Sequence, residues 1–285
     1  MKRGNVELDT GRERHFVNGL AKGLAIIRAF NDDARALTLA EAAVRTGLSR
    51  AAARRILMTL EDLGFAARHG ERHFVLTPKV LSLGYAYLSS MPLWAFAQPV
   101  LESLVEEMRE TCSIAVMDAT DLVYVLRIPL HRILTQGTTV GSRLPLYCHS
   151  SGRVLLSGLT PMQLESYLDR ADLKAYTDRT ITDPSQLRRV IAEAGLKGYA
   201  YVNGELQEHI SGVSVPIFQP DGSVIAALNA SFNRRNVKDA TVLRKTLPKL
   251  RSAAQRLNAA LAVGPSPQRR IVRMGQVQGS RRHAR

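Results

Sequence analysis

Residues 38–63 read TLAEAAVRTGLSRAAARRILMTLEDL, and the caps and stops in this stretch predict two helices joined by a tight turn. Thr38 and Glu41 have the spacing of a capping box, in which the threonine hydroxyl accepts from a backbone amide and the glutamate reaches back. Gly47 is expected to end the first helix, and Ser49 is expected to cap the second. A helix, a glycine-containing turn and another helix form the arrangement that places the second helix in the major groove of DNA.

The second helix of this pair is expected to carry its basic residues on one side. Its buried side, read at helical spacing, consists of Ala53, Ile56, Leu57, Leu60 and Leu63. Three arginines face the other way, with no acidic residue before Glu61. Arginine bonds guanine edges or holds phosphates, although an arginine-rich face can also be an ordinary solvated surface. The residues expected to contact DNA from this pair of helices are Thr38, Ser49, Arg50, Ala51, Arg54 and Arg55.

The flanking segments favour the DNA-binding interpretation. Upstream, an apolar face at helical spacing predicts one more helix and consists of Leu20, Leu24, Ile27 and Phe30. Downstream, residues 65–76 have the pattern of a β-hairpin with a basic tip, which is the wing of a winged helix-turn-helix. Arg68 and Arg72 are candidate phosphate contacts on that wing, and His69 is a weaker one. Residues 16–76 are therefore predicted to be a DNA-binding domain.

Residues 77–91 predict a linker helix between two domains. Thr77 and Pro78 are typical of a helix start, because proline lacks an amide hydrogen that the first turn would leave unbonded. The segment that follows is apolar almost all round, so we expect it to be buried against the next domain or against a second subunit.

Residues 92–262 predict an α+β domain, in which strands form hairpins and helices lie outside them. The expected strands are 113–117, 122–126, 144–146, 199–202, 213–217 and 223–232. The expected helices are 96–111, 150–158, 236–261 and two that begin at the pairs Thr160-Pro161 and Asp183-Pro184.

This second domain carries no recognisable catalytic motif. It contains neither a dinucleotide fingerprint nor a P-loop, a zinc-protease helix or a nucleophile elbow. Cys148 and His149 are adjacent in sequence, which does not place a base against a nucleophile. Cys112 and Cys148 have no C-x-x-C spacing, so neither a disulfide scaffold nor a structural zinc site is expected. We expect neither an enzyme nor a cofactor.

A binding site for a small molecule is a better expectation. Ser150, Ser151 and Gly152 form a small-residue entry to a helix, where free amides and the helix dipole favour a carboxylate. Asn229 and Ser231 alternate with apolar neighbours and therefore point to one face of their strand. A few polar groups among apolar ones fit a ligand pocket, although these side chains can equally bond to a sheet edge or to solvent.

The formal charge of +14 indicates a polyanionic partner, nucleic acid before membrane. The last 22 residues contribute six arginines and no acid, so much of the charge lies outside the predicted domains. Residues 1–15 and 263–285 lack apolar periodicity and are expected to be disordered. There is no apolar run of membrane-spanning length and no hydrophobic signal core, which predicts a cytoplasmic protein without a membrane role.

Five stretches together resemble the IclR family of bacterial transcriptional regulators, and most of all its regulators of protocatechuate, 4-hydroxybenzoate and β-ketoadipate pathways. They are FVNGLAKGLAIIRAF, TLAEAAVRTGLSRAAARRILMTLEDLGF, FVLTPKVLSLGYAYLSS, VGSRLPLYCHSSGRVLLSGL and GSVIAALNASF. The resemblance covers about residues 16–261. It implies a winged helix-turn-helix, a linker helix that pairs subunits and a GAF-like effector domain. It also implies a dimer or a dimer of dimers on palindromic double-stranded operator DNA, with no cofactor.

The same resemblance implies a small carboxylate effector, aromatic or a product of ring cleavage. Its pocket would be formed by Ser150, Ser151, Gly152, Glu205, Asn229 and Ser231. Two departures from the family pattern predict a ligand of different shape: a pocket polar position is Gly212, and His149 occupies a site that is usually small. Two other functions stay open, namely an enzyme acting on an aromatic acid and a DNA-binding protein without a ligand.

Overall fold

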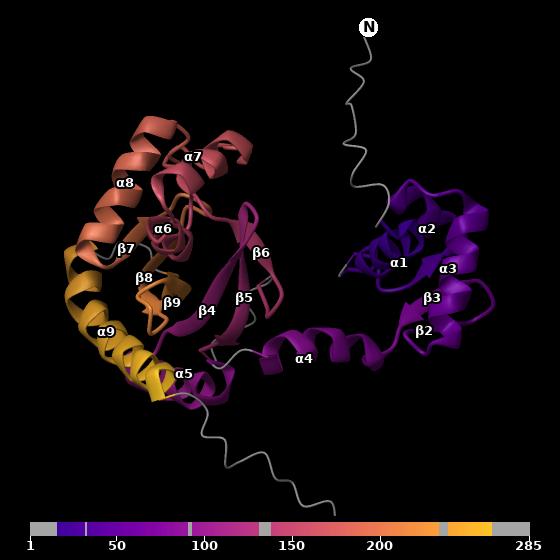
Figure 1. The fold of residues 1–285 in the computed structure, drawn as a ribbon, viewed down its shortest axis with the longest axis horizontal. Helices are drawn as coiled ribbons and strands as arrows, with labels where there is room; N and C mark the ends of the chain where they lie inside the picture. The colour runs from indigo at the N-terminus through magenta and orange to yellow at the C-terminus, as the bar shows by residue number, and fades with distance from the viewer. Residues whose placement is uncertain (1–15, 32, 91–92, 131–137, 234–238, 264–285) are drawn as a thin grey trace, which may run out of the picture. The chain divides into compact units, whose positions relative to one another are not determined.

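The computed structural model of the protein describes residues 16–31, 33–90, 93–130, 138–233 and 239–263 (Figure 1). Contacts divide the chain into one unit of residues 1–90 and another of residues 91–285. The two segments predicted to be disordered, 1–15 and all but the first residue of 263–285, lie outside the described residues. No helix of the described part is both long enough and apolar enough to span a membrane.

The N-terminal unit is a winged helix-turn-helix, as predicted. Its helices are α1 (Asn18–Arg28), α2 (Leu39–Thr46) and α3 (Arg50–Asp62), and its strands are β1 (Leu37–Thr38), β2 (Ala66–His69) and β3 (His73–Leu76). The antiparallel strands lie in the order β1-β3-β2. Thr38 and Glu41 form the expected capping box on α2, and Ser49 caps α3 by accepting from the amide of Ala52. Gly47 ends α2 with φ +68°, a left-handed conformation that glycine adopts without strain.

Three apolar residues of this unit are exposed instead of buried. In α1, Ile26 is the buried residue, whereas Leu20 and Leu24 are 63% and 47% exposed. Leu63 is 53% exposed, because α3 ends at Asp62 and Leu63 is its C-cap. The prediction therefore included exposed residues in the buried faces of α1 and α3. The short strand β1 was not predicted from the sequence.

The linker helix begins with one 3₁₀ turn, Pro78–Val80, and continues as α4 (Leu81–Ser90). Its start is tied to the end of α3: the Thr77 hydroxyl donates to the Gly64 carbonyl at 2.6 Å, and Lys79 Nζ donates to the Leu63 carbonyl at 2.7 Å. No residue of α4 is buried within the single chain. Its exposed apolar side chains include Leu81, Leu83, Tyr85 and Tyr87.

The C-terminal unit is built on one antiparallel sheet in the order β6-β5-β4-β9-β8-β7, which confirms the α+β prediction. The strands are β4 (Thr111–Asp118), β5 (Asp121–Ile128), β6 (Arg143–Pro145), β7 (Ala200–Asn203), β8 (Ile210–Phe218) and β9 (Val224–Asn233). The helices are α5 (Trp94–Met108), α6 (Ser150–Ser157), α7 (Pro161–Arg170), α8 (Pro184–Lys197) and α9 (Asp239–Val263).

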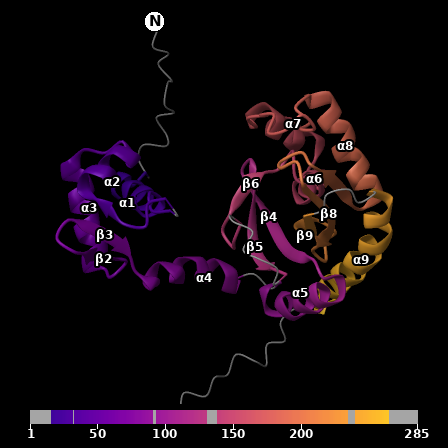
Figure 2. The same cartoon turned by 180° about the vertical axis from the view of Figure 1, so that it is seen from behind.

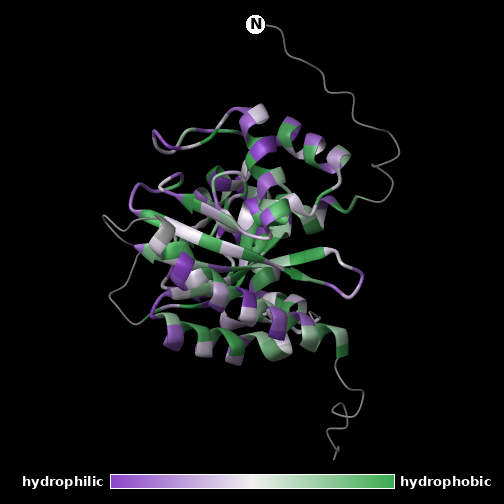
Figure 3. Ribbon diagram, turned by 90° about the vertical axis from the view of Figure 1, so that its left-hand side faces the viewer, coloured by the Kyte–Doolittle hydropathy of each residue, from purple (hydrophilic) through white to green (hydrophobic). Residues whose placement is uncertain are grey.

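Helices cover this sheet from two directions. α5 and α9 pack against each other and against the sheet, and both views of the ribbon show them side by side (Figures 1 and 2). α6 packs on the central strands, and α8 packs on α6. Hydrophobic residues are concentrated on the strands between these helices (Figure 3). Large side chains buried between sheet, α6 and α8 include Leu122, Tyr147, Leu156 and Leu187.

The pairing of the central strands brings small and polar residues into one row. In the register of β4 with β9, Ser113 lies opposite Asn229. In the register of β8 with β9, Gly212 lies opposite Ser231 and Ser214 opposite Asn229. The N-terminus of α6 packs onto these strands. A polar cluster of Ser113, Ser150, Ser214 and Asn229 is thereby buried between these strands and α6.

Candidate nucleic-acid interface and ligand cavity

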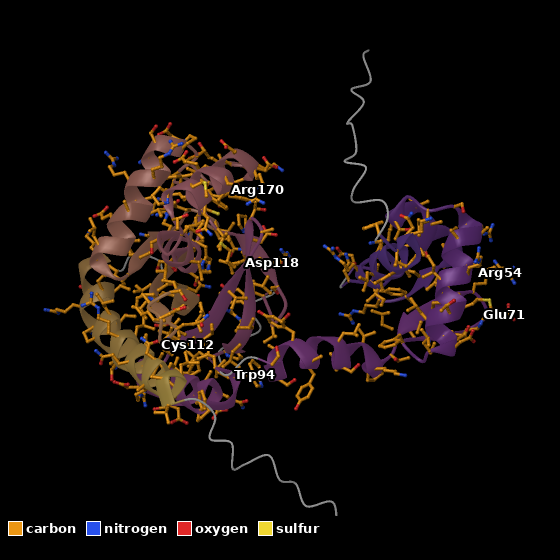
Figure 4. The ribbon with its side chains drawn as sticks, in the orientation of Figure 1. Arg54, Glu71, Trp94, Cys112, Asp118 and Arg170 are labelled. Carbon is orange, nitrogen blue, oxygen red and sulfur yellow. The ribbon has the colours of Figure 1, made fainter. Side chains whose placement is uncertain are left out.

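The side of α3 that faces away from the core is basic. Arg50, Arg54 and Arg55 are exposed, as is the small Ala51. Arg54 projects from α3 on the side turned away from α1 and α2 (Figure 4). Within the described part of the chain, no ion pair involves any of these three guanidinium groups. Their charges therefore remain available to a polyanion.

The wing presents a different set of groups. Arg68 Nε lies 3.3 Å from a carboxylate oxygen of Glu61, and its guanidinium stacks 4.9 Å from the centre of the Phe74 ring. Much of the Arg68 charge is thus already compensated. His69 and Arg72 are exposed at the hairpin.

A cavity of about 860 Å³ lies in the C-terminal unit. It is lined by residues from β4, β5, β8, β9, the start of α6 and the segment after β7. Three residues of the predicted pocket are among its lining, Ser150, Gly212 and Ser231. A Cβ atom added to Gly212 would lie 2.7 Å from Ser150 Oγ, so glycine keeps this part of the wall open.

Asn229 does not line the cavity but organises the polar cluster behind it. Its Oδ1 accepts from Ser150 Oγ at 3.1 Å and from Ser214 Oγ at 3.0 Å. Its Nδ2 donates to Ser113 Oγ at 3.3 Å and to Ser231 Oγ at 2.8 Å. These four bonds use both donors and both lone pairs of the amide, so Asn229 positions the hydroxyls around it.

Ser151 and Gly152 also lie behind the cavity wall. The Ser151 amide, expected to be free for a carboxylate, donates to Nδ1 of His149, the N-cap of α6, at 3.1 Å. A Cβ atom at Gly152 would lie 1.9 Å from the Leu146 carbonyl oxygen, so this glycine allows α6 to pack closely on the preceding loop.

Glu205 is held in a buried ion pair and is not among the residues that line the cavity. Its carboxylate lies 2.6 Å from the guanidinium of Arg153, and their side chains are 8% and 6% exposed. The Ile181 amide donates to the same carboxylate at 3.3 Å, and Arg153 Nε donates to the Tyr147 carbonyl at 3.1 Å. The pair joins α6 to the segment after β7, where the next two residues, Leu206 and Gln207, line the cavity.

One corner of the cavity contains Tyr124, Arg127 and His149. Tyr124 Oη lies 3.0 Å from His149 Nε2, and the Arg127 guanidinium lies 5.4 Å from the centre of the Tyr124 ring. Burial, with the nearby positive charge of Arg127, lowers the pKa of His149 to about 4. Burial raises the pKa of Tyr124, so this phenol keeps its proton.

Sequence reasoning singled out His149 but missed the other two members of this corner. The one available signal was a tyrosine and an arginine in an otherwise apolar strand, LVYVLRI. Arg109, which also lines the cavity, gave no signal, because a left-handed residue after a helix (φ 56°) carries no side-chain pattern.

The adjacent Cys148 and His149 do not form a catalytic pair. Burial raises the pKa of the Cys148 thiol to about 12, and that thiol donates to the Pro145 carbonyl at 3.9 Å. Both imidazole nitrogens of His149 are bonded elsewhere, to Tyr124 and to Ser151. In the described part of the chain, no group of three or more His, Cys, Asp or Glu could hold a metal ion.

Comparison with known proteins matches both units to one family. Residues 19–70 match the IclR helix-turn-helix domain, and residues 85–259 match the bacterial transcriptional regulator IclR C-terminal domain. The Pca regulon regulatory protein of Pseudomonas putida is 41% identical over 243 residues, covering 85% of this chain and 83% of that protein. The p-hydroxybenzoate hydroxylase transcriptional activator of Acinetobacter baylyi is 35% identical over 251 residues, covering 86% and 92%.

A solved structure shares the fold over almost its whole length. The IclR homolog from Microbacterium hydrocarbonoxydans, complexed with 4-hydroxybenzoate, is 29% identical with a TM-score of 0.75. The match covers 86% of this chain and 99% of that one. The arginine-bearing α3, the wing and the C-terminal cavity thus occur in a chain that belongs to the IclR family of bacterial transcriptional regulators.

Proposed function

We propose that this regulator binds a small aromatic carboxylate in its C-terminal cavity and changes its operator binding in response. The observation that carries the proposal is the cavity corner in which Arg127, unpaired within the described residues, lies beside a phenol donor. An uncompensated guanidinium in a partly buried site favours an anion. Relatives named for the Pca regulon and for p-hydroxybenzoate hydroxylase, and a neighbour holding 4-hydroxybenzoate, support an aromatic acid.

On the DNA side, Arg50, Arg54 and Arg55 enter the major groove, and Ala51 allows close approach. His69 and Arg72 on the wing hold phosphates, with Arg68 contributing less because Glu61 compensates it. Thr38 and Ser49 fix the starts of α2 and α3 and so the angle at which α3 meets DNA. The exposed apolar side chains of α4 pair with a second copy, which gives a homodimer or a dimer of dimers on a palindromic operator.

A ligand screen tests the effector. With 4-hydroxybenzoate or benzoate in excess, the melting temperature of the full chain should rise, because a ligand that binds only the folded state adds about 2.7 kcal/mol at a hundredfold excess over its Kd. The same compound should change operator affinity, since an effector acts through its different affinity for two states. No stabilisation by any aromatic acid would instead support a DNA-binding protein without a ligand, and consumption of the acid would support an enzyme.

The basic C-terminal segment is expected to act through charge alone. Deleting residues 264–285 removes six arginines. Nonspecific DNA affinity should fall and its dependence on salt should flatten, by up to about 5 in the log–log slope if every arginine contacts a phosphate. Specific operator recognition should remain, as measured by fluorescence anisotropy over a salt series. Loss of recognition with the tail would contradict this division of roles.

A further inference from the structure

We propose that His149 orients the Tyr124 hydroxyl as a hydrogen-bond donor into the cavity, and that Tyr124 and Arg127 together anchor the carboxylate of the ligand. This rests on the proposed effector function and specifies which wall of the cavity meets which group of the ligand. In this assignment Tyr124 and Arg127 are binding residues and His149 is a positioning residue.

The direction of the hydrogen bonds begins at the backbone of α6. An amide can only donate, so the Ser151 amide at 3.1 Å makes His149 Nδ1 an acceptor. His149 is neutral at physiological pH, because burial and the Arg127 charge lower its pKa to about 4. A neutral imidazole that accepts at Nδ1 carries its proton on Nε2. That proton is donated to Tyr124 Oη, 3.0 Å away.

The hydroxyl of Tyr124 therefore has to donate elsewhere. Ser113 acts to lower the pKa of Tyr124 against the larger effect of burial, and the Ser113 oxygen accepts from Nδ2 of Asn229. A bond donated to a phenol oxygen favours the charged form of the phenol, so this direction makes Ser113 a donor to Tyr124. Tyr124 Oη then accepts from both Ser113 and His149, which fills the lone pairs of a phenol oxygen. Its own hydrogen is left for the cavity that Tyr124 lines.

Arg127 adds the charge at the same corner. Its guanidinium lies 5.4 Å from the centre of the Tyr124 ring, and both residues belong to β5. Neither group can accept a hydrogen bond in this arrangement, because a guanidinium only donates and the phenol oxygen is already occupied. A carboxylate, which only accepts, fits this corner, whereas a carboxamide would bring its NH₂ group against donors.

The proposed carboxylate anchor, Tyr124 with Arg127, can be tested with two ligands of nearly equal shape, 4-hydroxybenzoate and 4-hydroxybenzamide. Calorimetry on the full chain should show that the acid binds at least about tenfold more tightly than the amide, since a donor-lined site rejects a group it cannot pair with.

Tyr124→Phe should weaken binding of the acid about tenfold. Arg127→Gln should weaken it about thirtyfold, because a charge-assisted bond is lost. Tyr176→Phe, at an exposed tyrosine of the same unit, is the matched control and should bind like the wild type.

A spectroscopic readout tests the orienting role of His149 without any ligand. The ¹⁵N spectrum of the imidazole, assigned by its absence in His149→Asn, should show a protonated Nε2 and a bare Nδ1 at neutral pH. Asparagine can still cap α6 but lacks the Nε2 proton, so this variant should also lose part of the preference for acid over amide. His209→Asn, at an exposed histidine, should keep that preference.

The outcomes distinguish a failure of the proposed carboxylate anchor, Tyr124 with Arg127, from a failure of the proposal that the effector is an aromatic carboxylate. If the acid binds but Tyr124→Phe binds it equally well, or if His149 carries its proton on Nδ1, the anchor is wrong and the effector class stands. If neither probe binds while His149 shows the Nε2 proton, the proposed effector class is wrong and the donor orientation of Tyr124 stands. Wild-type binding that ignores the difference between acid and amide would also overturn the anchor.

Discussion

Replacing Arg50, Arg54 and Arg55 together by alanine is expected to abolish specific operator binding by this regulator. Each arginine that bonds a base bidentately contributes about 1–3 kcal/mol of discrimination. Three substitutions should therefore lower specific affinity by at least about a hundredfold, and Arg54→Ala alone by about 1–3 kcal/mol. The measurement is a titration of labelled operator DNA, compared with DNA of scrambled sequence at the same salt concentration.

The loss would come from missing contacts and not from misfolding. All three side chains are exposed, and alanine is the best helix former, so α3 should persist. A matched control removes the same charge from exposed arginines of the C-terminal unit, Arg189, Arg244 and Arg256. That control should change nonspecific binding at most. Specific affinity that survives the triple change on α3 would exclude this helix as the recognition element.

The geometry of this helix followed from local rules, which is why it could be predicted from sequence. The capping box at Thr38, the glycine stop at residue 47 and the Ser49 cap are each made by residues no more than four positions apart, and the structure contains all three. What failed was the extent of burial at Leu20 and Leu63, because exposure depends on where neighbouring elements end and not on spacing alone.

The cavity was predictable only in part, for a physical reason. Ser150 and Ser231 were expected from the sequence pattern and Gly212 from the resemblance, and all three line it, whereas Ser151, Gly152 and Asn229 are not among the lining residues. The partners of Asn229 come from three strands and a helix, up to 116 residues away in sequence. The pattern of apolar and polar residues within one segment cannot predict contacts between residues so far apart in the sequence. The pairing of β4 with β9 creates it.

Glu205 was expected in the ligand pocket, but the structure places it in a buried ion pair with Arg153. Its substitution is expected to have the second large effect, a loss of folding stability. Glu205→Ala leaves the Arg153 guanidinium, 6% exposed, without a counter-charge. Breaking a buried ion pair from one side destabilises by about 3–5 kcal/mol, because the remaining charge stays desolvated. Trp94 is the one tryptophan of the chain and lies on α5, so its fluorescence during urea denaturation reports on the C-terminal unit.

A double replacement distinguishes the cost of an unpaired charge from the net value of the ion pair. Arg153→Met combined with Glu205→Leu removes both charges and keeps the volume, and buried pairs replaced in this way are often neutral in stability. We therefore expect the double variant to recover most of the stability that Glu205→Ala loses. Glu208→Ala, an exposed glutamate three residues along the same segment, should change stability little.

The same variants separate a structural role for Glu205 from a direct contact with the ligand. The carboxylate bonds to Arg153 and Ile181, while Leu206 and Gln207 next to it line the cavity. If Glu205 acts by holding that segment, the stable double variant should still be stabilised by an aromatic acid. If Glu205 contacts the ligand itself, ligand stabilisation should be lost in the double variant despite its recovered fold, and that result would confirm the assignment of Glu205 to the pocket.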